Sequence, residues 1–204
     1  MMGVVSGTEK ILREQYSGTP KDNHENIMFA VSSLLSRSIG QESVDDILKD
    51  ALRTIHRLFD FQFVAIALKD RDEVFRYKVQ LGLTPESEKK YFEIQYTAAD
   101  LFDDTSFPST AVSDITRFYM AENSPYKEAE IGSYARPTHL GDKRARADDM
   151  VEGDYIDFYI RDWKNEVIGY FELASTRSKK LPTRDNIRWL ELIATLLGIM
   201  ISKR

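Results

Sequence analysis

The chain has 204 residues, of which 42% are hydrophobic and 30% charged, and its formal net charge is −5 at neutral pH. This apolar content excludes a wholly disordered chain, and the negative charge provides no overall attraction to nucleic acid or anionic lipid. The sequence contains no cysteine. Disulfides, thiolate catalysis, cysteine-based zinc or iron–sulfur sites and thioether-linked chromophores are therefore excluded.

Residues 1–22 are polar and rich in turn formers, which predicts a weakly ordered N-terminal arm before one domain over residues 23–204. No segment reaches the run of about 18 apolar residues that suggests a membrane span, and the N-terminus lacks the apolar core of a signal peptide. We therefore expect a cytoplasmic protein that binds neither membranes nor nucleic acid.

Two helices are predicted at the start of the domain. The first covers about residues 23–38, where apolar side chains recur at helical spacing, and Gly40 is expected to end it. Ser43 followed by Asp46 resembles a capping box. It predicts the start of a second, strongly amphipathic helix that continues to about residue 59.

Two strands joined by a polar turn are predicted next. Residues 61–68 (FQFVAIAL) form a continuous apolar run of strand length, typical of a strand buried on both faces. Residues 74–81 (VFRYKVQL) alternate between apolar and polar, as in a partly exposed strand. The short polar segment between them predicts a hairpin.

The middle of the chain, residues 84–150, is irregular. It predicts a short helix at 85–91, a strand at 111–115 and a helical turn at 118–122. Aromatic side chains are scattered here among serine, threonine, aspartate and proline. This composition is typical of an ordered loop rather than a disordered linker.

Residues 155–160 (YIDFYI) and 167–174 (VIGYFELA) predict a second pair of strands around a turn at 162–165. Alternation gives the last strand an apolar face, which should meet helices, and a mixed face, which suits a ligand. The apolar face comprises Val167, Gly169, Phe171 and Leu173. The mixed face comprises Ile168, Tyr170 and Glu172.

Thr183 is the expected N-cap of a last helix that runs to about residue 203. Ten of the fifteen residues from 187 to 201 are large and apolar, which is more than one helix face can bury on a sheet. Leaving three or four exposed would forgo about 1.5–3 kcal/mol each. We therefore expect the first helix, together with the same two helices of a second copy, to cover them. The expected homodimer interface comprises Ile27, Val31, Leu34, Trp189, Ile193, Leu196 and Met200.

The closing segment resembles the C-terminal signature of GAF domains. Residues 168–173 (IGYFEL) match a strand of the "iGxLxL" kind, and residues 181–185 (LPTRD) match the step into the family's last helix. Residues 43–70 resemble the family's first core helix and strand. The resemblance covers roughly residues 25–203 and is a pattern rather than an invariant catalytic motif.

The resemblance implies an α+β fold of the GAF/PAS-like kind. It has a central antiparallel sheet of about six strands, N- and C-terminal helices packed on one face, and a small-molecule pocket on the other. Three specialised branches of the family do not fit. Without cysteine the chain can neither attach a bilin covalently nor act as a methionine-sulfoxide reductase, and it lacks the Asn-Lys-x-Phe-Asp-Glu-type motif of the cyclic-nucleotide-binding branch.

Catalysis and metal binding find little support in the sequence. Of the three histidines no two have metal-ligand spacing, so we expect no metal site, and only His139 is placed as a haem ligand would be. The sequence has no Gly-x-Ser-x-Gly motif and no glycine-rich phosphate loop. We therefore expect no enzyme and no catalytic residues.

The candidate ligand pocket combines loop aromatics with the mixed face of the last strand and with a basic segment around residues 136–146. Its expected residues are Phe102, Phe107, Tyr119, Tyr126, Tyr134, Arg136, His139, Tyr170 and Glu172. The same aromatics could equally form a minor core that holds a long loop to the sheet. The basic segment is either an anion-binding lid or a solvated loop balanced by neighbouring acids.

These observations predict a sensory or regulatory module. It would bind an unidentified small molecule and, as a homodimer, transmit the signal through its terminal helices to a separate output protein. The alternative is a dimerisation or protein-interaction scaffold whose pocket is closed or vestigial. The cofactor, if any, stays unknown.

Overall fold

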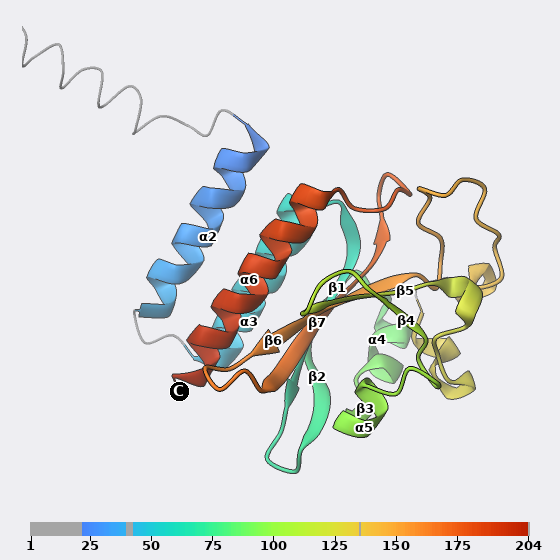
Figure 1. Ribbon diagram of the computed structural model, residues 1–204, viewed down its shortest axis with the longest axis horizontal. Helices are drawn as coiled ribbons and strands as arrows, with labels where there is room; N and C mark the ends of the chain where they lie inside the picture. The colour runs from blue at the N-terminus through green and yellow to red at the C-terminus, as the bar shows by residue number, and fades with distance from the viewer. Residues whose placement is uncertain (1–21, 40–42, 135, 204) are drawn as a thin grey trace, which may run out of the picture.

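The structure is a computed structural model that describes residues 22–39, 43–134 and 136–203. A single antiparallel sheet of seven strands runs through it in the order β3-β2-β1-β7-β6-β5-β4 (Figure 1). The strands are β1 (Phe61–Lys69), β2 (Val74–Leu81), β3 (Gln95–Thr97), β4 (Ser109–Ala111), β5 (Thr116–Tyr119), β6 (Tyr155–Arg161) and β7 (Val167–Thr176). The predicted α+β class is confirmed, with seven strands where about six were expected.

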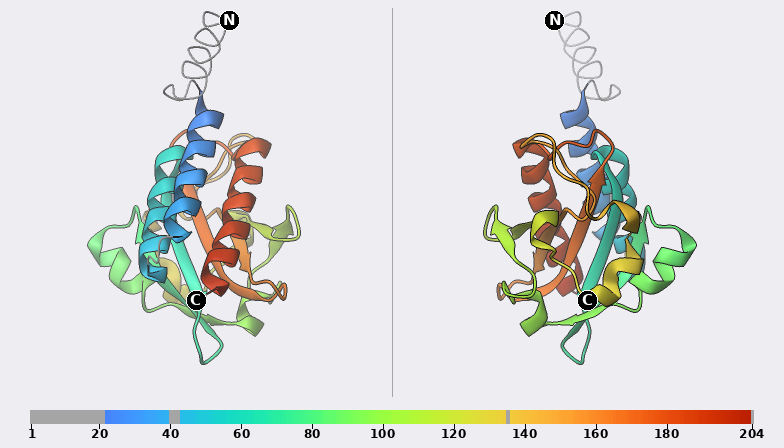
Figure 2. Two further views of the ribbon diagram at one scale, coloured as in Figure 1. Left: turned by 90° about the vertical axis from the view of Figure 1, so that its left-hand side faces the viewer. Right: turned by 90° about the vertical axis from the view of Figure 1, so that its right-hand side faces the viewer.

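Three long helices cover one face of this sheet: α2 (Asn23–Ile39), α3 (Val44–Leu58) and α6 (Arg184–Ser202). α3 packs on β1 and β2, and α6 packs mainly on β6. α2 packs on α3 and α6 and forms an outer layer (Figures 1 and 2). The other face carries the short helices α4 (Pro85–Tyr91) and α5 (Ala98–Leu101) and the 3-10 turns η1 (Ala121–Asn123), η2 (Glu128–Ser133) and η3 (Pro137–His139).

The helix starts predicted from capping residues are confirmed. The side chains of Ser43 and Thr183 accept hydrogen bonds from the backbone N–H groups of Asp46 and Asn186, which satisfies otherwise unpaired donors in the first turns of α3 and α6. Both hairpins also lie where alternation predicts them. The expected arm, apart from Asp22, and the expected helix stop at Gly40 lie outside the described residues.

The expectations for residues 111–122 are correct only at their edges. Ala111 belongs to β4, and a helical turn is present, but at Ala121–Asn123 instead of from residue 118. Residues 112–115 are the turn of a β4–β5 hairpin, in which the N–H of Val112 donates to the carbonyl of Thr116. β4 therefore ends at Ala111, and β5 begins at Thr116, after the expected strand. Residues 118 and 119, expected to start a helical turn, are extended. Ser113 and Asp114 lie at the centre of this turn, and Val112 is 48% exposed. Turn chemistry, rather than the apolar residues that flank it, decides the structure here.

The predicted faces of β7 are correct for its central part. Phe171 and Leu173 join the core under the helices, and Tyr170 belongs to the cluster on the opposite face. At the start of the strand the assignment is wrong, because a bulge between β6 and β7 shifts the register. Ile168 therefore packs with the helix-side core and Val167 with the opposite cluster. A Cβ on Gly169 would lie 2.5 Å from the carbonyl oxygen of Ala67, so glycine permits the close approach of β1 and β7.

The helix residues expected at a dimer interface are mostly internal to the chain. Ile27, Val31, Leu34, Ile193 and Met200 are at most 6% exposed and pack in the core between the helices and the sheet. Only Trp189 and Leu196 keep substantial exposed surface. α6 thus buries its apolar residues mainly on the sheet, and α2 adds part of the cover within one chain.

Across the described residues, no helix combines the length and apolarity required to cross a bilayer.

Candidate functional site

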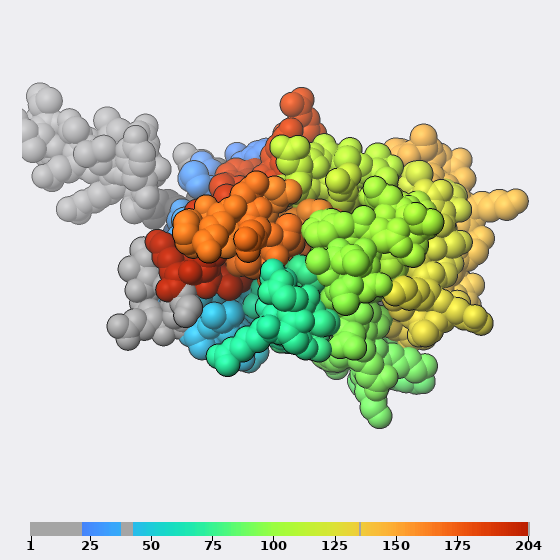
Figure 3. Space-filling model, turned by 60° about the horizontal axis from the view of Figure 1, so that its bottom comes forward, coloured from blue at the N-terminus to red at the C-terminus, as the bar shows by residue number. Residues whose placement is uncertain are grey.

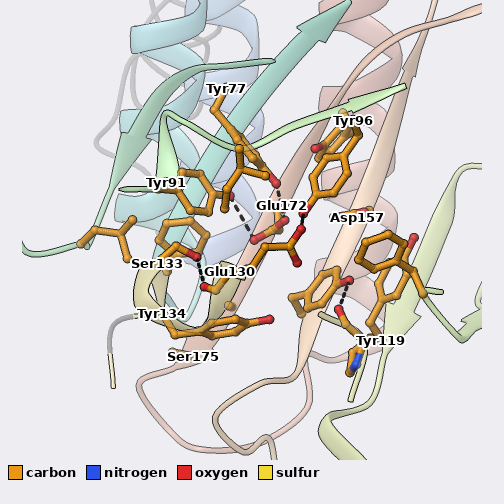
Figure 4. Close-up of a pocket in the computed structure, with 18 of the residues that line it drawn as sticks. Tyr77, Tyr91, Tyr96, Tyr119, Glu130, Ser133, Tyr134, Asp157, Glu172 and Ser175 are labelled. Carbon is orange, nitrogen blue, oxygen red and sulfur yellow. Dashed lines mark hydrogen bonds between the residues drawn. The ribbon is translucent and has the colours of Figure 1, made fainter. Parts of the chain in front are cut away.

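A partly enclosed pocket lies on the sheet face opposite the three long helices (Figure 4). Its floor is formed by side chains of β1, β6 and β7, and its walls and roof by β2, α4, β3, β5, η2 and the loops beside them. The cavity volume is about 60 Å³, which is room for about four water molecules or a ligand of a few heavy atoms. Figure 3 shows the outer surface of the covering segments, coloured green to yellow, away from α6.

Strand alternation positions the floor of the pocket. Asp157 on β6 lies directly opposite Glu172 on β7, and both point to the pocket face. Glu172 is in turn paired with Ala65 on the other side, and Tyr170 with Ala67. Because these two alanines fill little space, the larger polar side chains beside them have a cavity above them instead of a packed layer.

Glu172 accepts two hydrogen bonds from tyrosine hydroxyls. Tyr77 donates at 2.8 Å and Tyr91 at 3.1 Å, one to each carboxylate oxygen (Figure 4). Burial raises the pKa of Glu172 to about 7, against the lowering effect of the two tyrosine donors. The pKa values of both tyrosines lie well above their usual range, chiefly because of burial, so these hydroxyls remain neutral donors. The carboxyl group is therefore poised to gain or lose a proton near neutral pH.

Two buried polar atoms in the pocket have no hydrogen-bond partner among the described residues: Oδ1 of Asp157 and the hydroxyl of Tyr170. Asp157 is 2% exposed and Tyr170 1% exposed. Burial and the nearby charge of Glu172 raise the pKa of Asp157 well above its usual range. An unsatisfied buried polar group typically costs about 1–3 kcal/mol, so two of them in one cavity suggest that another molecule satisfies them.

The roof carries two further carboxylates. Glu130 accepts a hydrogen bond from the hydroxyl of Tyr96 at 3.0 Å and from the backbone N–H of Lys127 at 2.9 Å. Glu152 pairs with Arg136, whose Nη2 lies 2.8 Å from Oε2. Both acids are thus held by protein donors, whereas Oδ1 of Asp157 has none among the described residues.

Five of the nine residues expected in the pocket line it, namely Phe107, Tyr119, Tyr134, Tyr170 and Glu172. The other four lie outside the cavity lining. Phe102 is 50% exposed and packs edge-on against Tyr159. Tyr126 packs against the outer side of Tyr134.

The remaining two expected residues, Arg136 and His139, are exposed. Arg136 acts on the site only through its ion pair with Glu152. Nδ1 of His139 lies 2.7 Å from Oδ2 of Asp142, on the surface. Arg144, another member of the basic segment, pairs with Glu122 at 2.9 Å and Asp154 at 2.8 Å. These arginines are neutralised by the protein's own acids, which argues against an anion-binding lid.

The sequence reasoning missed several residues that define the pocket: Tyr77, Tyr91, Tyr96, Glu130, Glu152, Tyr155 and Asp157. Asp157 did leave a signal, because it is the single acid within the otherwise apolar run YIDFYI. An acid on the buried face of a strand is rarely placed there for structure alone. No sequence pattern indicates Glu130 or Tyr96, because only the folding of the loops over the sheet brings these residues to the cavity.

Within the described part of the chain, no three or more His, Asp or Glu side chains are grouped so as to hold a metal ion. The pocket instead offers carboxylates, hydroxyls and aromatic rings, which suit a small organic molecule.

No protein-family model matches this sequence, and no curated protein matches it. Solved structures do match. The GAF domain of a phosphoenolpyruvate-protein phosphotransferase from Coxiella burnetii is 12% identical, with 89% of this chain and 96% of that chain covered at a TM-score of 0.58.

Two further structures are similar. A GAF domain/HD domain protein from Geobacter sulfurreducens is 14% identical, with 81% of this chain and 96% of that chain covered at a TM-score of 0.58. A domain of a putative two-component sensor histidine kinase from Sinorhizobium meliloti is 13% identical, with 80% and 93% covered at a TM-score of 0.54. The chain therefore has the fold of GAF domains.

Proposed function

We propose that the protein is a sensory or regulatory module that binds a small molecule in the pocket above Asp157 and Glu172. The observation that carries this proposal is the pair of buried polar atoms without partners, on Asp157 and Tyr170, which face the pocket. A pocket that had become a mere loop core would be expected to lose such groups. The likeness to a sensor-kinase domain agrees with this role. The proposal assigns no catalytic step to the site.

The route by which a ligand would act on the helices runs through β5 and β6. Thr116 on β5 donates a hydrogen bond of 3.0 Å to Glu191 on α6, and both residues are buried. The next residue of β5, Arg117, is the register partner of Asp157. A ligand that shifts Asp157 would therefore move a strand that is tied directly to α6. Such a contact is the kind of element through which a binding site biases a helix.

Native mass spectrometry of the protein as purified tests the ligand. We expect a defined extra mass on the folded chain that is lost on denaturation, because an occupant would satisfy the two unpartnered buried polar atoms of the pocket. If the folded protein instead carries no extra mass and none appears after incubation with cell metabolites, the scaffold alternative is favoured and the proposal fails.

Dimerisation through the terminal helices is part of the proposal, but the surface available for it differs from the expected one. On α6, Leu192 and Ile199 are 40% and 47% exposed, and half-buried Leu196 lies between them. The spacing of four and three residues places all three on one stripe of the helix. Met200, one turn after Leu196, is 4% exposed, so the stripe borders the buried face of the helix.

The double variant Leu192→Glu/Ile199→Glu should therefore be monomeric and folded, because it places charges only on exposed positions. Light scattering after gel filtration should give twice the 23.5 kDa chain mass for the natural protein and once that mass for the variant. A control with the same added charge, Ala98→Glu/Ala99→Glu on α5, should remain dimeric, since those alanines are exposed away from α6. A natural protein that is monomeric, or a double variant that still dimerises, would contradict this part of the proposal.

A further inference from the structure

The floor of the pocket holds two carboxylates that have no counter-charge. Asp157 and Glu172 are direct cross-strand partners, an arrangement in which like charges repel. Among the described residues that line the pocket, none is lysine, arginine or histidine. The pocket therefore lacks a positive charge beside its two floor carboxylates and hydrogen-bond partners for two of its buried polar atoms.

The nearest basic side chains do not fill this gap. Arg136 is committed to Glu152, and Nζ of Lys127 lies outside the cavity, 5.8 Å from the ring centre of Tyr96 and 5.4 Å from that of Phe107. Arg117 is the register neighbour of Asp157, yet no ion pair joins these two residues in the part of the chain that the structure describes. A positive charge that comes from outside the chain has no internal competitor at this position.

Aromatic rings surround the two carboxylates. The rings of Tyr77 and Tyr91 have centres 4.0 Å apart (Figure 4). Tyr170 lies edge-on to Tyr77, with ring centres 5.8 Å apart. The π faces of such rings attract cations, and the attraction grows when water is excluded. The aromatic rings and the carboxylates therefore both favour a positively charged ligand.

We infer that the pocket, if it binds a small molecule as proposed above, takes a small protonated amine whose ammonium group lies between Asp157 and Glu172. The free Oδ1 of Asp157 would accept a hydrogen bond from the ammonium group, and the unpartnered hydroxyl of Tyr170 would bond to a polar group of the ligand. The cavity volume of about 60 Å³ restricts the ligand to a few heavy atoms. A metal ion is a poorer occupant, because the described side chains form no group of three or more ligands for it.

Three probes of nearly equal size test the sign of the ligand charge: n-propylammonium chloride, n-propanol and sodium propionate. Each is titrated into the full chain at about pH 8, where the amine is still protonated and Glu172 is largely ionised, and binding is followed by amide chemical shifts in NMR. We expect propylammonium to bind at least about tenfold more tightly than propanol, and propionate to be the weakest. The shifts should centre on the backbone of β6 and β7.

Isosteric variants connect the binding to the two acids. Glu172→Gln and Asp157→Asn should each weaken propylammonium binding by at least about tenfold, because each removes a carboxylate that would otherwise pair with the ammonium group in a water-poor site. Glu93→Gln, which neutralises an exposed acid outside the pocket, should change it less than about twofold.

The failures of this inference and of the proposed function are distinguishable. If propanol or propionate binds as tightly as propylammonium, or if the two pocket variants bind the amine like the natural protein, the amine inference is overturned and the pocket remains a small-molecule site. If none of the probes binds, although native mass spectrometry shows a retained ligand, the inference is again overturned and the proposed function stands. Binding of magnesium or calcium chloride at these residues in preference to the amine would replace it with a metal site.

Discussion

Replacing Gly198 by alanine is expected to destabilise the protein by about 2 kcal/mol or more, although alanine normally stabilises a helix by about 1 kcal/mol relative to glycine. A Cβ at this position of α6 would lie 2.0 Å from the carbonyl oxygen of Arg161 and 3.0 Å from its carbonyl carbon. Backbone atoms cannot rotate away, so the helix or the end of β6 must move. The measurement is the free energy of unfolding in urea.

The matched control is Gly141→Ala, because a Cβ at Gly141 would meet no heavy atom within 4 Å. Its free energy of unfolding should lie within about 0.5 kcal/mol of the natural value. If Gly198→Ala proved as stable as the control variant, the close packing of α6 on the end of β6 would be incorrect.

The second large effect is a loss of stability as the pH rises from about 4.5 to 7. The pKa of Glu172 is about 7 in the folded protein against an ordinary value of 4.5, so the unfolded chain ionises first. Below both values the group contributes no penalty. Across the window the folded state loses up to about 3 kcal/mol relative to the unfolded one. Asp157, whose pKa is also raised, acts in the same direction.

The variant Glu172→Gln should remove the contribution of Glu172 to this pH dependence, so that it is about as stable as the natural protein near pH 4.5 and more stable near pH 8. Its side chain has nearly the same shape and can still accept a hydrogen bond from a tyrosine hydroxyl. His56, whose pKa is lowered chiefly by burial, contributes an opposite slope, but it does so equally in both proteins. Urea unfolding at a series of pH values measures the difference. Parallel pH profiles for the natural protein and the variant would show that Glu172 is not buried in a carboxyl-rich pocket.

These two experiments also separate the roles of the two sheet faces. Gly198 reports on the tight contact between α6 and the sheet, which any stable fold of this kind requires. Glu172 reports on a group whose burial weakens the folded protein at neutral pH. A stability cost of this kind at a buried acid is typical of a binding or catalytic site.

Much of the fold follows from local patterns in the sequence. The apolar run at 61–68 and the alternation at 74–81 and 155–174 identify four strands, and Ser43 and Thr183 identify the starts of two core helices. These elements obey short-range rules, because a strand repeats every two residues and a helix start needs an acceptor for its free N–H groups. The resemblance at the C-terminal end then implied the fold class, and the structure confirms it.

The middle segment shows where local rules stop. The sequence could not place the turn at Ser113 and Asp114 against the competing apolar residues on either side, and it could not show that Tyr96 and Glu130 meet across the pocket. The two groups of that pair are 34 residues apart. Their contact depends on how several loops close over the sheet, which no periodicity records.

The sequence by itself determined the strand and helix skeleton, the placement of Tyr170 and Glu172 on one face of a strand, and the exclusion of cysteine chemistry. Only the tertiary structure decided that Asp157 and Glu172 stand side by side without a counter-charge, and that α2 packs on α3 and α6 and covers part of the apolar surface of α6 within one chain. The physical reason is that burial and electrostatic balance are properties of the whole set of neighbours. A residue's own sequence context records which face it occupies, but not which charges and surfaces the rest of the chain brings to it.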